Sequence, residues 1–214
     1  MDIYNERREY LHSGAQGLHA DDLNDSPIIQ FKHWLENAKQ SDIKDPTAMM
    51  LATVDTNGCP SQRTVLLKAF NDQGFNFFTN LASNKAQQIQ HNENVSLIFP
   101  WLTLERQVII SGKAIQLSAK ENAEYFLSRP RDSQLAAWVS NQSSPISSKQ
   151  LLLSKFEDMS QRFANKDISP PKFWGGYRVE PTRIEFWSGS AKRLHDRFEY
   201  IKSDNQWIIQ RLQP

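Results

Sequence analysis

The stretch that decides the fold is Arg63-Thr64-Val65-Leu66-Leu67-Lys68. Its β-branched and aliphatic residues, with turn signals on either side, predict a β-strand over residues 62–70. Side chains alternate along a strand, so Arg63 faces one side and Lys68 the other. A cation at each end of a buried strand is unfavourable unless an anion meets it, and opposite faces point to two different anions. The alternative is that both cations lie at sheet edges and reach water.

The composition limits the class of protein. The chain has 214 residues, enough for one domain with a sizeable core. With 25 Lys and Arg against 24 Asp and Glu, bulk charge does not favour a nucleic-acid partner. Cys59 is the single cysteine, so an intrachain disulfide is excluded. No apolar run approaches the roughly 20 residues of a membrane span, and no apolar signal core begins the chain. We therefore expect a cytoplasmic protein without a membrane partner.

Short strands with tight turns follow one another around the opening stretch. Five such strands predict a small barrel or a strongly curved sheet. The first three are expected to form an antiparallel meander, with Asn57-Gly58 as a hairpin turn signal. The five expected strands cover residues 48–54, 62–70, 75–79, 95–101 and 107–116.

Helices are expected before, within and after these strands. Ser26-Pro27 opens an amphipathic helix to about residue 40, and Ser118 with Glu121 forms a capping box for a helix to residue 127. Asp132 is expected to cap a helix to residue 139. Further helices are predicted at 84–91 and 149–163, and further strands at 174–179, 183–187, 198–202 and 206–211. Residues 1–25 are interpreted as a mobile arm with a short helical piece at 5–11, and residues 26–214 as a single domain.

Several kinds of site are absent from the sequence. The five histidines and the lone cysteine show no metal-ligand spacing, so no metal site is expected. Neither a P-loop nor a G-x-G-x-x-G motif follows a strand. A phosphorylated ligand would therefore have to be bound by side-chain cations and hydroxyls.

Besides the opening stretch, two clusters suit an anion. Thr79 and Ser83-Asn84-Lys85 lie at an expected helix N-terminus, where free N–H groups favour negative charge; the alternative is a plain cap with a solvated lysine. Tyr125 and Arg129 share a helical face, and Ser133 follows the Pro130 break. The alternative there is a surface ion pair between Arg129 and Asp132, worth little.

A fourth cluster lies near the C-terminus. If the chain is extended, Arg193, His195 and Arg197 share a face and would repel one another without an anion. The alternative is a solvated basic loop. Trp187, just upstream, could stack on a flat ring. Gln107 opens a strand and could bond the edge of a heterocycle, although an exposed strand residue is the simpler interpretation.

The residues of these clusters belong to longer motifs, which occur in a fixed order. These are R-T-V-L-L-K, F-P-W-x-x-L-E-R-Q-V, Y-F-x-S-R-P-R-D-S-Q, A-W-V-S-x-Q-S-S, F-W-G-G-Y-R-V, I-E-F-W and R-L-H-D-R-F. Together they resemble the pyridoxamine 5′-phosphate oxidase family, from about residue 7 to the C-terminus. The resemblance implies an α+β, mainly β, FMN-binding split β-barrel of Greek-key type with surrounding helices, and a homodimer with FMN at its interface.

The resemblance also implies roles for individual residues. FMN contacts would fall on Arg63, Thr64, Val65, Leu66, Leu67, Lys68, Phe78, Thr79, Asn84, Lys85, Gln107, Gln142, Ser143, Trp187 and Arg197. Contacts to the substrate phosphate would fall on Lys68, Tyr125, Arg129 and Ser133. Arg193 and His195, the implied catalytic pair, would hold the pyridine ring with Leu194 between them. Arg7, Arg8, Glu9 and Tyr10 resemble a segment that closes over the substrate.

The implied activity is oxidation of pyridoxine 5′-phosphate and pyridoxamine 5′-phosphate to pyridoxal 5′-phosphate. O₂ would be the acceptor, giving H₂O₂, and the amine would also release ammonia. This sequence departs from the family at Asn84, where a second basic residue is common, and in its less basic segment 17–22. The alternatives are another split-barrel FMN oxidoreductase, a non-enzymatic binder of pyridoxal phosphate, and a purely structural dimer.

Overall fold

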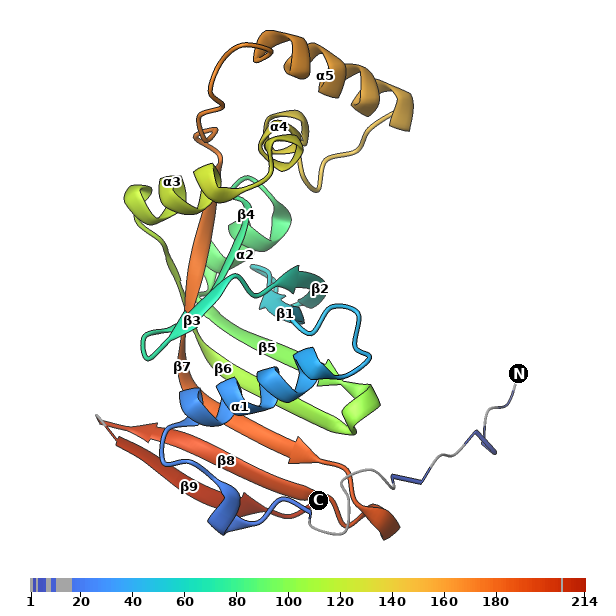
Figure 1. The fold of residues 1–214 in the computed structure, drawn as a ribbon, viewed down its shortest axis with the longest axis vertical. Coiled ribbons are helices and arrows are strands. Elements are labelled where there is room, and N and C mark those ends of the chain that lie inside the picture. The colour runs from blue at the N-terminus through green and yellow to red at the C-terminus, as the bar shows by residue number, and fades with distance from the viewer. Residues whose placement is uncertain (1, 3, 7–8, 11–16, 205) are drawn as a thin grey trace.

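The protein is built on one nine-stranded antiparallel sheet that curls on itself (Figure 1). The computed structural model describes residues 2, 4–6, 9–10, 17–204 and 206–214. The strands are β1 (Ala48–Val54), β2 (Pro60–Leu66), β3 (Ala69–Asn71), β4 (Gly74–Asn80), β5 (Asn94–Trp101), β6 (Arg106–Gln116), β7 (Trp174–Ser188), β8 (Asp196–Ser203) and β9 (Gln206–Leu212). The helices are α1 (Pro27–Gln40), α2 (Asn84–His91), α3 (Ala119–Ser128), α4 (Arg131–Val139) and α5 (Lys149–Arg162), with short 3₁₀ turns at Ala20–Asp22, Leu102–Leu104 and Ala191–Arg193.

The long strand β7 organises the sheet. It pairs with β6 from Tyr177 to Ser188, with β4 over its first part and with β8 over its last part. The change of partner occurs at Pro181, opposite a register shift between Ser111 and Gly112. The prediction of two strands, at 174–179 and 183–187, is therefore wrong. A proline lacks the ladder N–H but is tolerated at a bulge, so the strand continues through it.

The opening stretch forms an edge and not a buried strand. β2 pairs with β1, whereas β3 pairs with β4, and the order β2-β1-β5-β6-β7-β4-β3 puts β2 and β3 at the two edges. Between them Leu67 N donates to Thr47 O and Lys68 N donates to Asn76 O, both at 2.9 Å. The predicted strand at 62–70 and the three-strand meander are therefore wrong. The predicted alternation is confirmed, because Arg63 is half-buried and Thr64 exposed.

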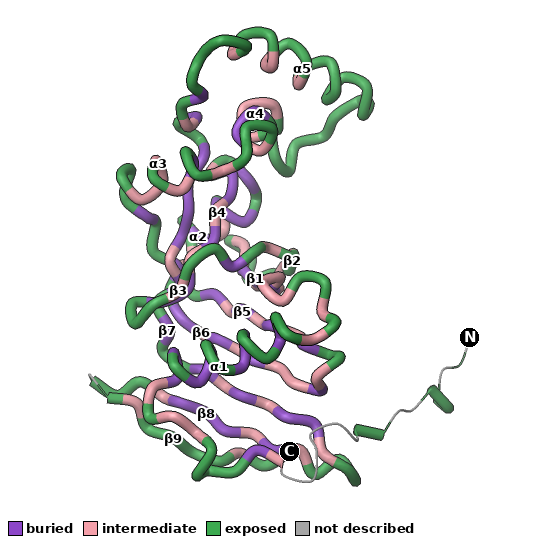
Figure 2. The backbone as a smooth tube through the Cα atoms, viewed as in Figure 1, coloured by how far each residue is buried: buried purple, intermediate pink, exposed green. Residues whose placement is uncertain are grey.

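Aromatic residues fill the main core between the sheet and α1. Phe31 is fully buried and meets Phe70, Phe75 and Phe99 edge-on, with ring centroids 5.0, 5.0 and 4.9 Å away. Helix α1 lies across β5 and β6 (Figure 1), and its predicted range is confirmed. In Figure 2 the buried positions follow the sheet strands and one side of α1. The predicted strands corresponding to β1, β4, β5, β6, β8 and β9 are also confirmed within a residue or two.

A smaller core joins α3, α4 and the start of β7. It contains Phe126, Leu135, Ile168 and Trp174. The capping box of α3 is confirmed, with the Ser118 side chain accepting from Glu121 N. Asp132 does not cap α4, since that helix begins at Arg131 with Pro130 as its N-cap. The fixed φ of proline starts this helix without a side-chain cap.

The N-terminal segment reaches β8 by way of Leu18. Leu18 is buried, and its N–H donates to Asp196 Oδ2 at 3.1 Å. The described residues of the helix predicted at 5–11 are Asn5, Glu6, Glu9 and Tyr10, and none of them is helical. Arg7, Arg8 and Leu11 lie outside the described residues. Within the described part of the chain, the helices are too short or too polar to cross a membrane.

Candidate functional site

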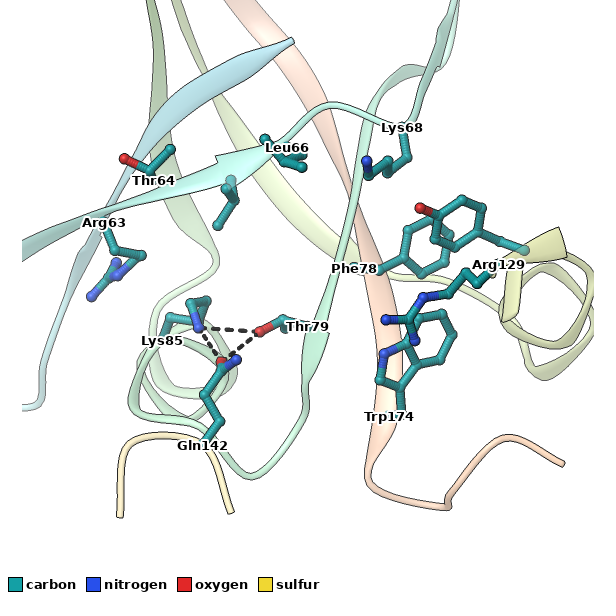
Figure 3. A pocket seen from close by; sticks show the side chains of 12 residues that line it. Arg63, Thr64, Leu66, Lys68, Phe78, Thr79, Lys85, Arg129, Gln142 and Trp174 are labelled. Carbon is teal, nitrogen blue, oxygen red and sulfur yellow. Dashed lines mark hydrogen bonds between the residues drawn. The ribbon is translucent and has the colours of Figure 1, made fainter. Parts of the chain in front are cut away.

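A cavity of about 430 Å³ opens where β2, β4, α2, α3 and the start of β7 meet (Figure 3). Its volume lies in the range of small-molecule sites. The lining residues are Arg63, Thr64, Val65, Leu66, Lys68, Phe78, Thr79, Lys85, Tyr125, Arg129, Gln142 and Trp174. All except Trp174 were singled out from the sequence. The structure thus brings residues from three of the four predicted clusters to one cavity.

Neutral oxygens hold Arg63 at this cavity. Its Nη1 donates to Leu51 O at 3.2 Å and to Thr53 Oγ1 at 2.5 Å. Its Nη2 donates to Ser61 Oγ at 2.7 Å and to Gln88 Oε1 at 3.4 Å. Burial lowers the pKa of the guanidinium, but an arginine stays charged near neutral pH. These contacts fix a positive charge in place without neutralising it.

Lys85 is the second cation at this side of the cavity. It is only 8% exposed, and its Nζ donates to Thr79 Oγ1 at 3.1 Å, to Ser83 Oγ at 3.4 Å and to Gln142 Oε1. Burial, reinforced by the nearby charge of Arg63, lowers the pKa of Lys85 to about 8. Two desolvated cations bonded to neutral acceptors form a strong site for an anion.

Asn84 and Ser143 lie beside this cation pair. Asn84 begins α2 and is exposed, and its backbone N–H donates to Ser143 Oγ at 3.2 Å. Ser143 follows Gln142 with a positive φ of 71°. Leu67, by contrast, is buried in the main core and does not line the cavity.

Arg129 provides a positive charge on the opposite side of the cavity. The guanidinium carbon lies 5.0 Å from the Trp174 ring centroid and 5.6 Å from that of Phe126. Its Nη1 is buried and has no hydrogen-bond partner among the residues that the structure describes. Burial lowers the pKa of Arg129 and raises that of Tyr125, while each group partly opposes the shift of the other. A buried guanidinium nitrogen without a partner points to a missing acceptor.

Three stacked rings lie on the Arg129 side of the cavity. Phe78 stacks on Tyr125 with centroids 4.0 Å apart and on Trp174 with centroids 5.2 Å apart. In Figure 3 Phe78 and Trp174 lie beside Arg129, with Lys68 above them. Ser133, on the first turn of α4, is half-buried and is not among the residues lining the cavity.

Trp174 is the lining residue that the sequence analysis missed. The motif F-W-G-G-Y-R-V contains it, but a tryptophan that opens a strand is usually interpreted as core. The signal lies in the glycines that follow it. A Cβ on Gly176 would lie 2.6 Å from Phe78 Cδ1, so glycine is needed there for Phe78 to take its place in the stack.

A second cluster, made of Tyr10, Trp187 and His195, lies near the other end of β7. The rings of Trp187 and His195 are 4.8 Å apart, and Tyr10 meets both edge-on at 5.5 and 5.1 Å. Ser190 N donates to His195 Nδ1 at 3.1 Å. The pKa of His195 is lowered by burial and then by Arg193, with Asp196 acting in the opposite sense. Neutral His195 therefore carries its proton on Nε2.

The predicted cationic face at residues 193–197 does not form. Arg193 lies in the 3₁₀ turn with a φ of 62°, and β8 begins only at Asp196. Arg197 is bonded to Glu185, with Nε–Oε1 at 2.7 Å and Nη2–Oε2 at 3.1 Å, which raises the pKa of Arg197. The condition for three cations on one face, an extended chain from residue 193 to 197, is not met, because Arg193 lies in the turn and a carboxylate meets Arg197. Leu194 is exposed, and Glu9 is exposed in the N-terminal segment.

The cavity and the second cluster lie far apart within one chain. Gln107 pairs with Trp187, and Trp187 pairs with Arg197, so these three belong with the second cluster. Trp174 and Trp187 are 13 positions apart on β7, which corresponds to roughly 40 Å along a strand. Figure 1 shows β7 running from α3 to the region of β8 and β9. Within one chain, the cavity and the second cluster therefore lie toward opposite ends of β7.

Comparison with known proteins identifies a family for both parts of the chain. Residues 35–163 match the family model for pyridoxamine 5′-phosphate oxidase, and residues 174–214 match that for the pyridoxine 5′-phosphate oxidase C-terminal dimerisation region. A Hahella chejuensis protein named pyridoxine/pyridoxamine 5′-phosphate oxidase is 55% identical over 215 residues, covering 100% of each chain.

Two solved structures share the fold. PhzG from Burkholderia lata 383, in complex with tetrahydrophenazine-1-carboxylic acid, has a TM-score of 0.87 and 29% identity, covering 93% of this chain and 98% of its own. A pyridoxamine 5′-phosphate oxidase-related, FMN-binding protein from Nostoc punctiforme has a TM-score of 0.71 and 18% identity, covering 86% and 95%. The predicted mainly β split-barrel fold is thereby confirmed. The chain belongs to the pyridoxamine 5′-phosphate oxidase family.

Proposed function

We propose that this protein is an FMN-dependent oxidase that converts pyridoxine 5′-phosphate and pyridoxamine 5′-phosphate to pyridoxal 5′-phosphate. O₂ is the electron acceptor and H₂O₂ a product, and the amine substrate also gives ammonia. Family membership supports the reaction class. The observation that carries the proposal is a single cavity with two separate cationic sides, Arg63 with Lys85 and Arg129 with Lys68. A phosphorylated cofactor and a phosphorylated substrate need two such sides.

The first side suits the phosphate of FMN. Arg63 and Lys85 bring positive charge, and Thr79, Gln142 and Ser143 bring hydroxyl and amide groups. Side chains replace the glycine-rich loops that the sequence lacks. The stretch Thr64–Leu67, Phe78 and Asn84 are further proposed contacts. When bound, FMN supplies two-electron acceptance and reoxidation by O₂.

The second side suits the phosphate of the substrate. The buried Nη1 of Arg129 has no partner in the described part of the chain, and Tyr125 and Lys68 line the same side. A dianionic phosphate bound there orients the rest of the substrate, so that its binding energy is used to position the reacting carbon. Ser133 remains a proposed fourth ligand from the adjoining turn of α4.

His195 and Arg193 are proposed to act on the pyridine end of the substrate. Because His195 Nδ1 accepts from Ser190 N, the neutral ring offers Nε2–H as a donor. This favours a role in which His195 orients the 4′ oxygen or nitrogen over one in which it removes a proton. Arg193 would lie against the pyridine ring. Arg7, Arg8, Glu9 and Tyr10 are proposed to close over it, and Tyr10 already contacts His195.

We further propose a homodimer whose subunits share the site. The cavity of one subunit would receive the cluster of Tyr10, Trp187 and His195 from its partner. The separation of roughly 40 Å along β7 supports this, since the two parts cannot meet in one chain. Gln107, Trp187 and Arg197 would then reach the FMN of the partner. The matched dimerisation region includes both Trp187 and Arg197.

An anaerobic visible spectrum tests the reaction. We expect purified protein to be yellow, to bleach on addition of pyridoxine 5′-phosphate without oxygen, and to recover its colour with formation of peroxide in air. A yellow protein that neither phosphorylated vitamer bleaches would contradict the proposed substrate and favour another flavin oxidoreductase. A colourless protein that cannot be reconstituted with FMN would favour a binder or a structural dimer.

A further inference from the structure

Among the described residues, Arg129 has no acidic partner. Its guanidinium lies over the Trp174 ring at 5.0 Å, and its buried Nη1 has no hydrogen-bond partner in that part of the chain. A carboxylate in that position would neutralise the charge and occupy the N–H donors. An aromatic face attracts the cation through its quadrupole and leaves the in-plane donors available. Figure 3 shows the guanidinium lying against the indole at the edge of the cavity.

The backbone of Arg129 is fixed separately. Arg129 ends α3 as its C-cap, and Pro130 prevents the helix from continuing. The buried amide of Gln134 donates from Nε2 to Phe126 O at 3.1 Å, Leu127 O at 3.3 Å and Arg129 O at 3.1 Å. One side chain therefore bonds three carbonyls at the end of α3, where a helix leaves carbonyls without intrahelical partners. These contacts set where the arginine side chain leaves the backbone.

We propose that Trp174 and Gln134 are positioning residues for Arg129. Gln134 fixes its backbone at the end of α3, and Trp174 supports its guanidinium so that the free donors meet a phosphate monoester in the cavity. The inference rests on the proposed function, in which Arg129 binds the substrate phosphate. It adds two residues that act through Arg129 and need not touch the substrate.

Trp174→Leu is the main test, because it removes the aromatic face and keeps an apolar side chain. We expect the KM for pyridoxine 5′-phosphate to rise about 2- to 30-fold, the range that a cation–π contact spans. Turnover at saturation and FMN content should be unchanged. Trp174→Phe keeps a smaller face and should lie between Leu and the natural residue. Gln134→Ala should also raise this KM, because it removes the contacts that fix the backbone of Arg129.

A double-mutant cycle separates positioning from general loss of structure. In an Arg129→Ala background, Trp174→Leu should leave KM unchanged, because the group it supports is gone. Trp138→Leu is the matched control. Trp138 belongs to the same small core and its indole donates to Ser169 O at 2.9 Å, but it does not line the cavity. This control should lower stability and leave KM unchanged.

Binding measured without turnover distinguishes this inference from the proposed function. The dissociation constant of pyridoxal 5′-phosphate, followed by absorbance titration, should show the same ratios among the variants. If the natural protein binds the phosphate ester but does not oxidise either vitamer, the proposed reaction fails and the positioning role stands. A Trp174→Leu protein with natural affinity, or one whose loss is equally large without Arg129, would overturn the positioning role.

Discussion

At the scale of single residues, Lys85 makes cofactor binding sensitive to pH. Its pKa in the described protein is about 8, and a bound phosphate would raise it. Below about pH 8 the lysine is already protonated, so FMN affinity should be constant there. Above that pH, binding must take up a proton, and the Kd for FMN should rise by up to about tenfold per pH unit. Flavin fluorescence quenching with FMN-free protein at about pH 7.5 to 9.5 measures it.

Lys85→Arg is the control for this titration. Arginine stays protonated throughout the range, so its Kd should not change between the two ends of the series. If another group, such as the flavin itself, also changes the Kd with pH, the change should be equal in both proteins, so the difference between them reports on Lys85. An unmodified protein with a flat profile up to the highest pH would contradict the idea that the charge of Lys85 anchors the phosphate.

The chemistry of individual residues was the part best read from the sequence. Arg63, Lys85 and Thr79 carry the donor groups that bind an anion, so residue type alone predicts an anion site. All three line the cavity. Trp174 was missed because its role depends on what lies over its face, which spacing does not reveal. The Arg197–Glu185 ion pair was missed for a similar reason, since Arg197 lies on β8 and Glu185 on the neighbouring strand β7.

At the scale of elements, a glycine in β7 determines whether the ring stack can form. Gly176 lies opposite Phe78, and a Cβ there would come within 2.6 Å of the Phe78 ring and 2.8 Å of Phe77 O. Gly176→Ala should displace Phe78, lower the free energy of unfolding by about 1–3 kcal/mol through overpacking, and weaken FMN binding. Thermal unfolding and a flavin titration measure the two effects.

Gly58→Ala is the control that separates the loss of stability from the loss of FMN affinity. Gly58 has a φ of 80° and nothing within 4 Å of the position where a Cβ would be. Alanine there should cost about 1–2 kcal/mol of backbone strain and leave FMN affinity unchanged. If Gly176→Ala, like Gly58→Ala, changed stability alone, Phe78 would not be part of the cofactor site.

Elements with a local signal were predicted well, and those that depend on distant partners were not. Helix α3 has its capping box and α1 its proline start within the sequence itself, and both ranges are confirmed. The break at Leu67-Lys68 arises because one end of the stretch pairs with β1 and the other leads to β4. The continuity of β7 through Pro181 depends on a bulge at Thr182, where two consecutive residues of β6 pair with Pro181 and Arg183. The residues of a single strand do not show which other strand it will pair with, so neither feature could be predicted from the local sequence.

At the scale of the whole molecule, the shared site makes a prediction that a site within one chain does not. Arg129→Ala should disable the cavity of its own subunit, and Arg193→Ala should disable the part that the same subunit gives to its partner. In a mixed dimer, one site carries both changes and the other carries neither. Two inactive proteins should therefore regain activity when mixed.

The amount regained is also defined. Equal mixing with free exchange makes about half of the dimers mixed, so about a quarter of all sites should be natural. Activity should approach that level after unfolding and refolding the two variants together, while each variant refolded alone stays inactive. Differently tagged variants, with mixed dimers isolated by both tags, give a direct count of sites per dimer. If isolated mixed dimers were no more active than their parents, each chain would have to build its own site. The roughly 40 Å along β7 between Trp174 and Trp187 would then need a different explanation.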